Sequence, residues 1–212
     1  MKINAVITKK PRIKMQGVRL TLTDKTLIII AFSMLISIVS GALIYKAQSE
    51  LFKNSIFDAF VAFSTDLSGK SFFEAFSGFF AVDLSVLLVL TVLGVSAFGR
   101  VPILALAVFR VVGIGTLGAY LFDSFGSAGF KYFLLVILPG KAFMFFALLL
   151  TVQNCFQTSG RIKLLSNGKL SETLDLKIFI VRNSVAAVIF ALSAVIDTIL
   201  LKFVSQYFLP DI

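Results

Sequence analysis

The chain has 212 residues, of which 58% are hydrophobic and 15% charged, and its mean hydropathy is +0.98. These values lie outside the range of soluble globular domains and indicate an integral membrane protein. The net charge of +9 does not point to nucleic acid, because the lysines and arginines gather in the N-terminal tail and one loop. The chain has no histidine and one cysteine, Cys155, which excludes an intramolecular disulfide and any histidine or multi-thiolate metal site.

Residues 1–25 form a basic tail, in which seven lysines and arginines accompany one acid, Asp24. Such a tail is expected to stay in the cytoplasm. The apolar residues 26–45 that follow are the first predicted span. A cleaved signal peptide is the alternative, but the long basic stretch and the lack of a clear A-x-A cleavage site favour a retained anchor.

Residues 46–77 are predicted to lie outside the membrane, and their apolar residues recur at helical spacing with charged residues between them. This pattern predicts an amphipathic helix on the outer leaflet. Two interpretations of its apolar face remain open: it packs back on the bundle, or it binds a partner. The candidate partner face consists of Phe52, Ile56, Phe57, Phe60 and Phe63.

Four further apolar stretches complete an all-α, polytopic membrane helix bundle of about five transmembrane helices, which forms one domain over residues 26–212. These four spans are predicted at residues 79–98, 101–122, 130–152 and 176–203. A tight cytoplasmic turn over residues 98–102 joins the second span to the third, and Pro102 suits the first turn of a helix. Residues 153–177 are predicted to form a cytoplasmic loop.

The distribution of basic residues sets the predicted orientation. The segments assigned to the cytoplasm hold twelve lysines and arginines, whereas those assigned to the outside hold five. The positive-inside rule therefore predicts a multi-pass protein of the cell membrane with a cytoplasmic N-terminus and an extracytoplasmic C-terminus.

The candidate intramembrane polar site consists of Arg110, Lys141 and Asp83. Both cations are predicted near the middle of the bilayer, where charge is costly, and Asp83 is about 10 Å further out along the helix axis, a gap that a snorkelling arginine side chain could narrow. Without an acid at their depth, we expect them to face a water-filled cavity, an anionic group or backbone carbonyls. Pro139 is predicted to break the fourth helix and free carbonyls for capping. Structural capping is favoured over an anion path.

Gly113, Gly115 and Gly118 match the string G-x-G-x-x-G, but a dinucleotide site needs a preceding strand that a hydrophobic span does not provide. Close helix packing is favoured over an unwound, ligand-contacting stretch. No catalytic constellation is found, since the aspartates Asp83, Asp123 and Asp197 are placed toward the outer interface. We therefore expect neither enzymatic activity nor a cofactor.

The run LGVSAFGRVPILALAVFRVVGIGTLGAYLF from residue 93, followed by VILPGKAFMF, resembles the stage II sporulation protein M family. The proline of the entry motif stands one residue late, after Arg100, and Gly140 and Lys141 replace polar amides. The residues that carry the likeness, or that we expect to serve in helix packing, are Gly94, Gly99, Pro102, Gly113, Gly115, Gly118, Pro139 and Gly140.

The resemblance implies a membrane component of the sporulation engulfment machinery, similar to the protein that assembles with two extracytoplasmic peptidoglycan hydrolases at the septum. Members also occur in organisms that do not sporulate. The leading hypothesis is a non-enzymatic scaffold whose partners are the lipid bilayer and membrane-associated cell-wall hydrolases. The alternative is a small permease, or a substrate-binding transporter subunit, for an anionic solute. A homo-oligomeric structural protein is a third hypothesis.

Overall fold

The computed structural model describes residues 25–166 and 176–204, and within these ranges it contains helices and no strand. The predicted basic tail, apart from Lys25, lies outside the described residues. The α-helices are α1 Lys25–Ala47, α2 Glu50–Gly69, α3 Phe72–Gly94, α4 Arg100–Tyr132, α5 Leu138–Ser166 and α6 Leu176–Ile199, and the π-helices are η1 Phe133–Ile137 and η2 Leu200–Val204. The prediction of an all-α membrane bundle is confirmed.

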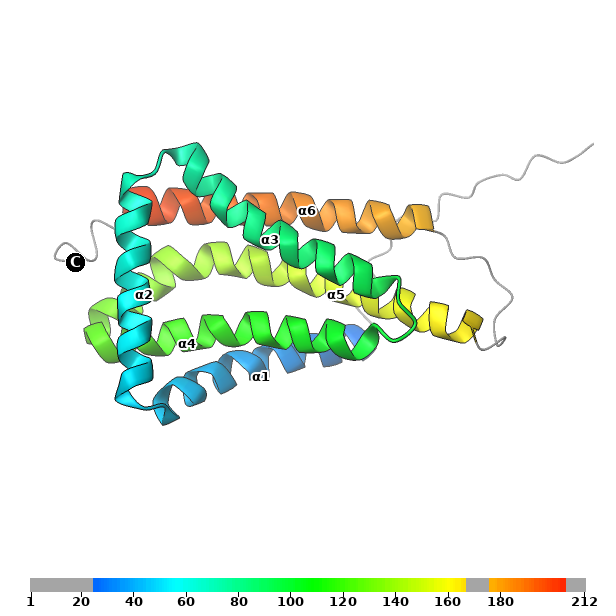
Figure 1. The fold of residues 1–212 in the computed structure, drawn as a ribbon, viewed down its shortest axis with the longest axis horizontal. Helices are drawn as coiled ribbons and strands as arrows, with labels where there is room; N and C mark the ends of the chain where they lie inside the picture. Colours follow the sequence, from blue (N-terminus) through cyan, green and yellow to red (C-terminus); the bar gives the residue numbers. More distant parts are fainter. Residues whose placement is uncertain (1–24, 167–175, 205–212) are drawn as a thin grey trace, which may run out of the picture.

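The helices form a bundle with one transverse element. Figure 1 shows α1, α4, α5 and α6 running roughly along the long axis, with α3 inclined across them, while α2 lies across one end of the bundle. The amphipathic segment is thus helical, as the spacing of its apolar residues predicts.

Four helical stretches in the described residues are long and apolar enough to cross a membrane: Lys25–Ala47, Phe72–Gly94, Arg100–Ser166 and Leu176–Val204. The third has 67 residues and would extend for about 100 Å as one straight helix, three times the apolar thickness of a bilayer. It reverses at Gly126, whose φ of 56° and ψ of −131° form a backbone conformation that glycine adopts readily and that residues with a Cβ rarely adopt. Figure 1 accordingly shows α4 and α5 side by side as two legs of a hairpin. Five crossings remain a prediction.

Two helix boundaries differ from the predicted spans. α3 begins at Phe72 rather than near residue 79, because the Ser71 hydroxyl and the Glu74 carboxylate cap its first turn reciprocally. The predicted loop is wrong over residues 153–166, which continue α5; residues 167–175 lie outside the described ranges. The polar residues at the start of that segment are buried between helices rather than exposed to water.

The predicted break at Pro139 is also wrong. The chain passes directly from η1 into α5, which begins at Leu138. The π-helical turn shifts the backbone hydrogen-bond register just before the proline, and so it accommodates a residue that has no N–H to donate.

A buried amide network joins α3, α5 and α6. Asn154 Nδ2 donates to Asn183 Oδ1 (2.7 Å) and to the Phe179 carbonyl (3.2 Å), while Asn183 Nδ2 donates to Thr91 Oγ1 (3.0 Å). Lipid supplies little hydrophobic drive for helix association, so such bonds help to fix which helices meet.

Glycines bring α1 and α4 together. A Cβ on Gly41 would overlap the Val112 carbonyl oxygen, and one on Gly115 would overlap that of Ile38. Thr116 Oγ1 adds a hydrogen bond of 3.2 Å to the Gly41 carbonyl. This is the close backbone approach that small residues permit in membranes.

The other glycines singled out in the sequence differ in their surroundings. Gly94 packs against Cys155, Gly99 is the N-cap of α4, and Gly118 faces the Phe133 ring. By contrast, a Cβ on Gly113 would meet no atom within 4 Å.

Candidate functional site

Both cations within the hydrophobic stretches form ion pairs with aspartates. Arg110 Nη2 lies 2.7 Å from Asp83 Oδ1, and Lys141 Nζ lies 2.7 Å from Asp197 Oδ2. The aspartate side chains are 4% and 2% exposed. The prediction that the two cations have no acid at their depth is therefore wrong, and they do not cap carbonyls freed by a proline break.

The error comes from counting residues along straight helices. The inclination of α3 and the length of the arginine side chain close the gap between Arg110 and Asp83. The turn of the α4–α5 hairpin extends past α2 in Figure 1, so residues counted from that turn lie less deep than the count suggests. Lys141 is therefore level with Asp197, which the sequence had placed toward the outer interface.

The four charged residues form one neutral group, which we call the charged quartet: Asp83 from α3, Arg110 from α4, Lys141 from α5 and Asp197 from α6. The two pairs are neighbours, because Lys141 lies close to the stretch of α3 that carries Asp83. Phe79, one turn before Asp83 on α3, has its ring centroid 5.9 Å from Lys141 Nζ. Two positive and two negative charges cancel within the quartet.

α5 and α6 approach each other closely beside the quartet. Ser193 Oγ donates a hydrogen bond of 2.8 Å to the Gly140 carbonyl. A Cβ on Gly140 would overlap Asp197 Oδ1, so glycine is what lets this carboxylate sit against α5. Asp197 Oδ1 is buried and has no hydrogen-bond partner among the described residues.

One face of α2 packs onto aromatic residues at the end of the bundle. The Phe60 ring centroid lies 5.6 Å from that of Tyr120 and 6.5 Å from that of Tyr132. Tyr45 completes the cluster, and its hydroxyl donates to Asp123 Oδ2 at 3.1 Å. The amphipathic helix thus packs back on the bundle through this face.

The candidate partner face is divided by this packing. Phe60 is 9% exposed and Ile56 is partly buried against the aromatic cluster, so neither is available to a partner. Phe52 (39%) and Phe57 (47%) are exposed. Phe63 is 41% exposed, yet its ring also packs against Phe79 on α3, with centroids 5.9 Å apart.

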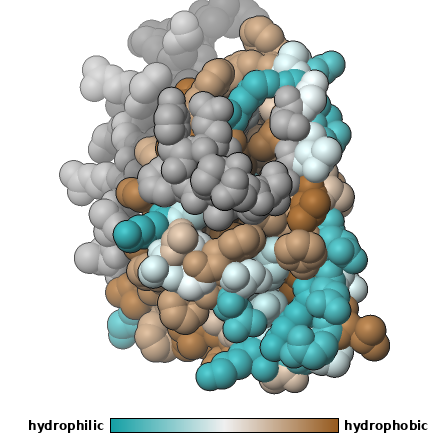
Figure 2. All heavy atoms as spheres, turned by 90° about the vertical axis from the view of Figure 1, so that its left-hand side faces the viewer, coloured by the Kyte–Doolittle hydropathy of each residue, from teal (hydrophilic) through white to brown (hydrophobic). Residues whose placement is uncertain are grey.

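Sequence reasoning missed Leu51, which is 81% exposed in the first turn of α2. Its neighbours on the outward side are mostly polar. Figure 2 looks onto this end of the bundle and shows hydrophilic residues along its right-hand side, mixed with hydrophobic ones. The outward side of α2 is thus a polar surface with a few exposed apolar side chains.

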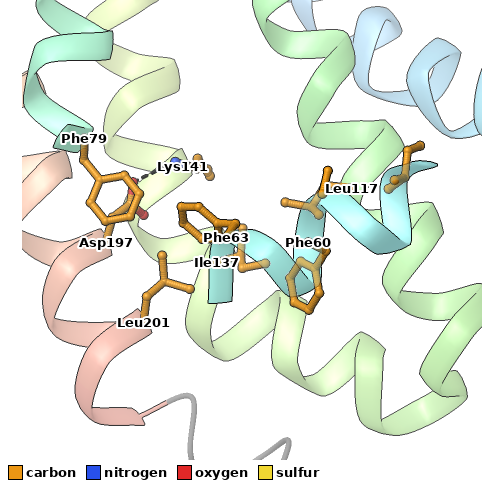
Figure 3. A pocket seen from close by; sticks show the side chains of 10 residues that line it. Phe60, Phe63, Phe79, Leu117, Ile137, Lys141, Asp197 and Leu201 are labelled. Carbon is orange, nitrogen blue, oxygen red and sulfur yellow. Dashed lines mark hydrogen bonds and ion pairs between the residues drawn. The ribbon is translucent and has the colours of Figure 1, made fainter. Parts of the chain in front are cut away.

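A cavity of about 310 Å³ lies between α2 and the bundle (Figure 3). Figure 3 shows the Lys141–Asp197 pair at one side of it, near the Phe79 and Phe63 rings. Its lining residues are Ile56, Ala59, Phe60, Phe63, Phe79, Leu117, Ile137, Lys141, Asp197 and Leu201. Across the described part of the chain, no group of three histidines, cysteines, aspartates or glutamates is placed to hold a metal ion.

Comparison with known families gives a match. A family model described as Stage II sporulation protein M matches residues 28–203, which is most of the chain. The chain belongs to the stage II sporulation protein M family. The resemblance inferred from the glycine and proline pattern is therefore confirmed. Neither curated proteins nor solved structures gave a match.

Proposed function

We propose that this protein is a non-enzymatic membrane scaffold, and that the outward side of α2 recruits peptidoglycan-remodelling partners outside the cell. Family membership supports this role. The observation that carries the proposal is the position of α2: one face is buried on the bundle, and the other faces away from it.

α2 is anchored firmly enough to act as a docking platform. Lys53 Nζ lies 3.2 Å from Glu50 Oε1 and 3.9 Å from Asp123 Oδ2, which ties the first turns of α2 to α4. At the other end, Lys202 Nζ donates to the Lys70 carbonyl. A held helix loses little conformational freedom when a partner binds, and this favours affinity.

The charge distribution supports an extracytoplasmic α2. Three lysines lie near α2, and each has a partner. Lys53 pairs with Asp123, Lys70 pairs with Asp66 at 2.5 Å, and Lys202 donates to the Lys70 carbonyl. Arg100 and Arg161 lie at the opposite end, where α4 begins and α5 ends, and belong to the segments that the positive-inside rule assigns to the cytoplasm. We infer from this a cytoplasmic N-terminus and an extracytoplasmic C-terminus.

The test replaces the two most exposed apolar side chains of the platform, in the variant Leu51→Ser/Phe57→Ser. The affinity-tagged protein is purified from native membranes, and its co-purifying peptidoglycan-degrading activity is measured. We expect this activity to fall to background. The matched control is Phe98→Ser, which changes an 82% exposed phenylalanine at the opposite end of the bundle. Undiminished activity with the platform variant would refute docking at α2.

The scaffold is favoured over an anion permease by the pairing of both cations. Arg110 and Lys141 each neutralise an aspartate, and an anion entering the quartet would meet two carboxylates as well. Uptake assays in reconstituted vesicles provide the check. Anion uptake that disappears in Lys141→Ala would reverse this preference.

A further inference from the structure

The cavity under α2 has the chemistry of a binding site rather than of a packing defect. Eight of its ten lining residues are apolar, and four of them, Ile56, Ala59, Phe60 and Phe63, come from the helix that covers it. The two charged residues, Lys141 and Asp197, meet in one wall (Figure 3). Small-molecule pockets typically combine such an apolar lining with a few converging polar groups.

The polar wall offers both a hydrogen-bond donor and an acceptor. An ammonium group has three N–H donors, and the described residues accept one from Lys141, at Asp197 Oδ2. The Lys141 side chain is 21% exposed and lines the cavity. Asp197 also lines the cavity; its Oδ1 packs against Gly140 of α5, while its Oδ2, which accepts from Lys141, retains further acceptor capacity.

The surroundings of the cavity are neutral overall, and this disfavours a charged ligand. The charged quartet sums to zero, and the remaining lining is apolar. A carboxylate or an ammonium group entering the cavity would carry an uncompensated charge into an apolar environment, which is strongly unfavourable. A hydroxyl group, by contrast, accepts one hydrogen bond and donates another without adding charge.

We propose that this cavity binds a neutral, single-chain membrane amphiphile whose hydroxyl accepts a hydrogen bond from Lys141 Nζ and donates one to the Asp197 carboxylate. A volume of about 310 Å³ holds roughly ten groups the size of a water molecule, which corresponds to a medium-length alkyl chain. The chain lies between Phe60, Phe63 and Leu117, and α2 forms its roof. This site is separate from the partner surface on the outward side of α2.

Photocrosslinking of the full-length protein in lipid nanodiscs tests the proposal. The probe is decanol with a diazirine near the end of its chain, and crosslinked residues are mapped by mass spectrometry. Unlabelled decanol, decanoate, decylamine and decane compete at equal membrane concentrations. We expect saturable crosslinking to the cavity lining, with decanol competing about tenfold better than the other three, as one added hydrogen-bonded group allows.

Two sets of variants separate the site from general lipid contact. Both Ala59 and Ala62 are exposed on α2, but only Ala59 lines the cavity, so Ala59→Trp fills the cavity whereas Ala62→Trp adds the same bulk outside it. Only the first should abolish crosslinking. Lys141→Met/Asp197→Leu removes both charges together and should remove the preference for decanol over decane, with thermal unfolding as the check that the variant is folded.

Several results would overturn the proposal. These are crosslinks spread evenly over the lipid-facing surface, equal competition by all four compounds in the unmodified protein, or an equal loss of crosslinking in Ala59→Trp and Ala62→Trp. Absence of saturable crosslinking would mean that the cavity holds water only, and it would equally refute the site. None of these outcomes bears on partner recruitment, which the Leu51→Ser/Phe57→Ser variant tests independently.

Discussion

Removing Arg110 and removing Asp83, the two partners of one ion pair, should have unequal effects on stability. At 2.7 Å, and with an effective dielectric constant of about 20, the gross attraction is about 6 kcal/mol, most of which is offset by desolvation. The asymmetry comes from burial, since the Asp83 side chain is 4% exposed whereas that of Arg110 is 31% exposed. An unpaired carboxylate would stay buried, but the longer and less buried arginine side chain can reorient toward the membrane surface.

We therefore expect Arg110→Met to reduce the free energy of unfolding by about 3–5 kcal/mol, because it leaves Asp83 buried and unpaired. Asp83→Leu should cost about 1–2 kcal/mol, because the long arginine side chain turns toward water. The double variant should lie within about 1 kcal/mol of the unmodified protein, since replacing a whole buried pair by apolar groups is often neutral.

The assay is the free energy of unfolding in bicelles for the four proteins of this double-mutant cycle. A double variant as unstable as Arg110→Met would refute the reasoning. It would mean that the loss of stability comes from losing the ion pair itself and not from leaving Asp83 buried and unpaired. Equal costs for the two single variants would contradict the argument from burial.

Three further substitutions test the packing of the bundle by thermal unfolding. Gly115→Val should cost about 1–3 kcal/mol, because its side chain would collide with a backbone carbonyl of α1, while Gly113→Val, at a position with open space, should change stability little. Asn183→Leu should cost about 1–2 kcal/mol through the loss of the amide network, against almost no change for Ser184→Ala on the exposed side of α6. Gly140→Ala should both destabilise the protein and weaken decanol binding, because the added methyl group displaces the carboxylate of Asp197, which lines the cavity; unchanged binding would contradict that placement.

The sequence was sufficient for the fold class and the family because both depend on local patterns. Apolar stretches of membrane-spanning length predict helices whatever their neighbours are. The glycine and proline spacing between residues 94 and 140 was enough to indicate the family. The amphipathic helix was likewise predictable from the recurrence of its apolar residues.

What the sequence could not provide were relations between helices. Gly41 is a lone glycine in an apolar run, and only the position of α4 shows that it forms a backbone contact. Residues 153–166 look like a loop because they are polar, but Asn154, Thr158 and Ser159 are buried against other helices. The two ion pairs were not predicted for the same reason, since a depth counted along one helix does not include the inclination of that helix.

The two proposed roles of α2 occupy different sides of one helix. Leu51 and Phe57 are exposed and do not line the cavity, whereas Phe60 is buried over it. A substitution on the outward side therefore leaves the cavity walls intact, and filling the cavity leaves the outward side chains in place. The two sites can influence each other only through the position of α2 itself, because that helix is the element that they share. If decanol binding alters partner recovery, the coupling must act through a displacement of α2, and Ala59→Trp should then alter partner recovery as well.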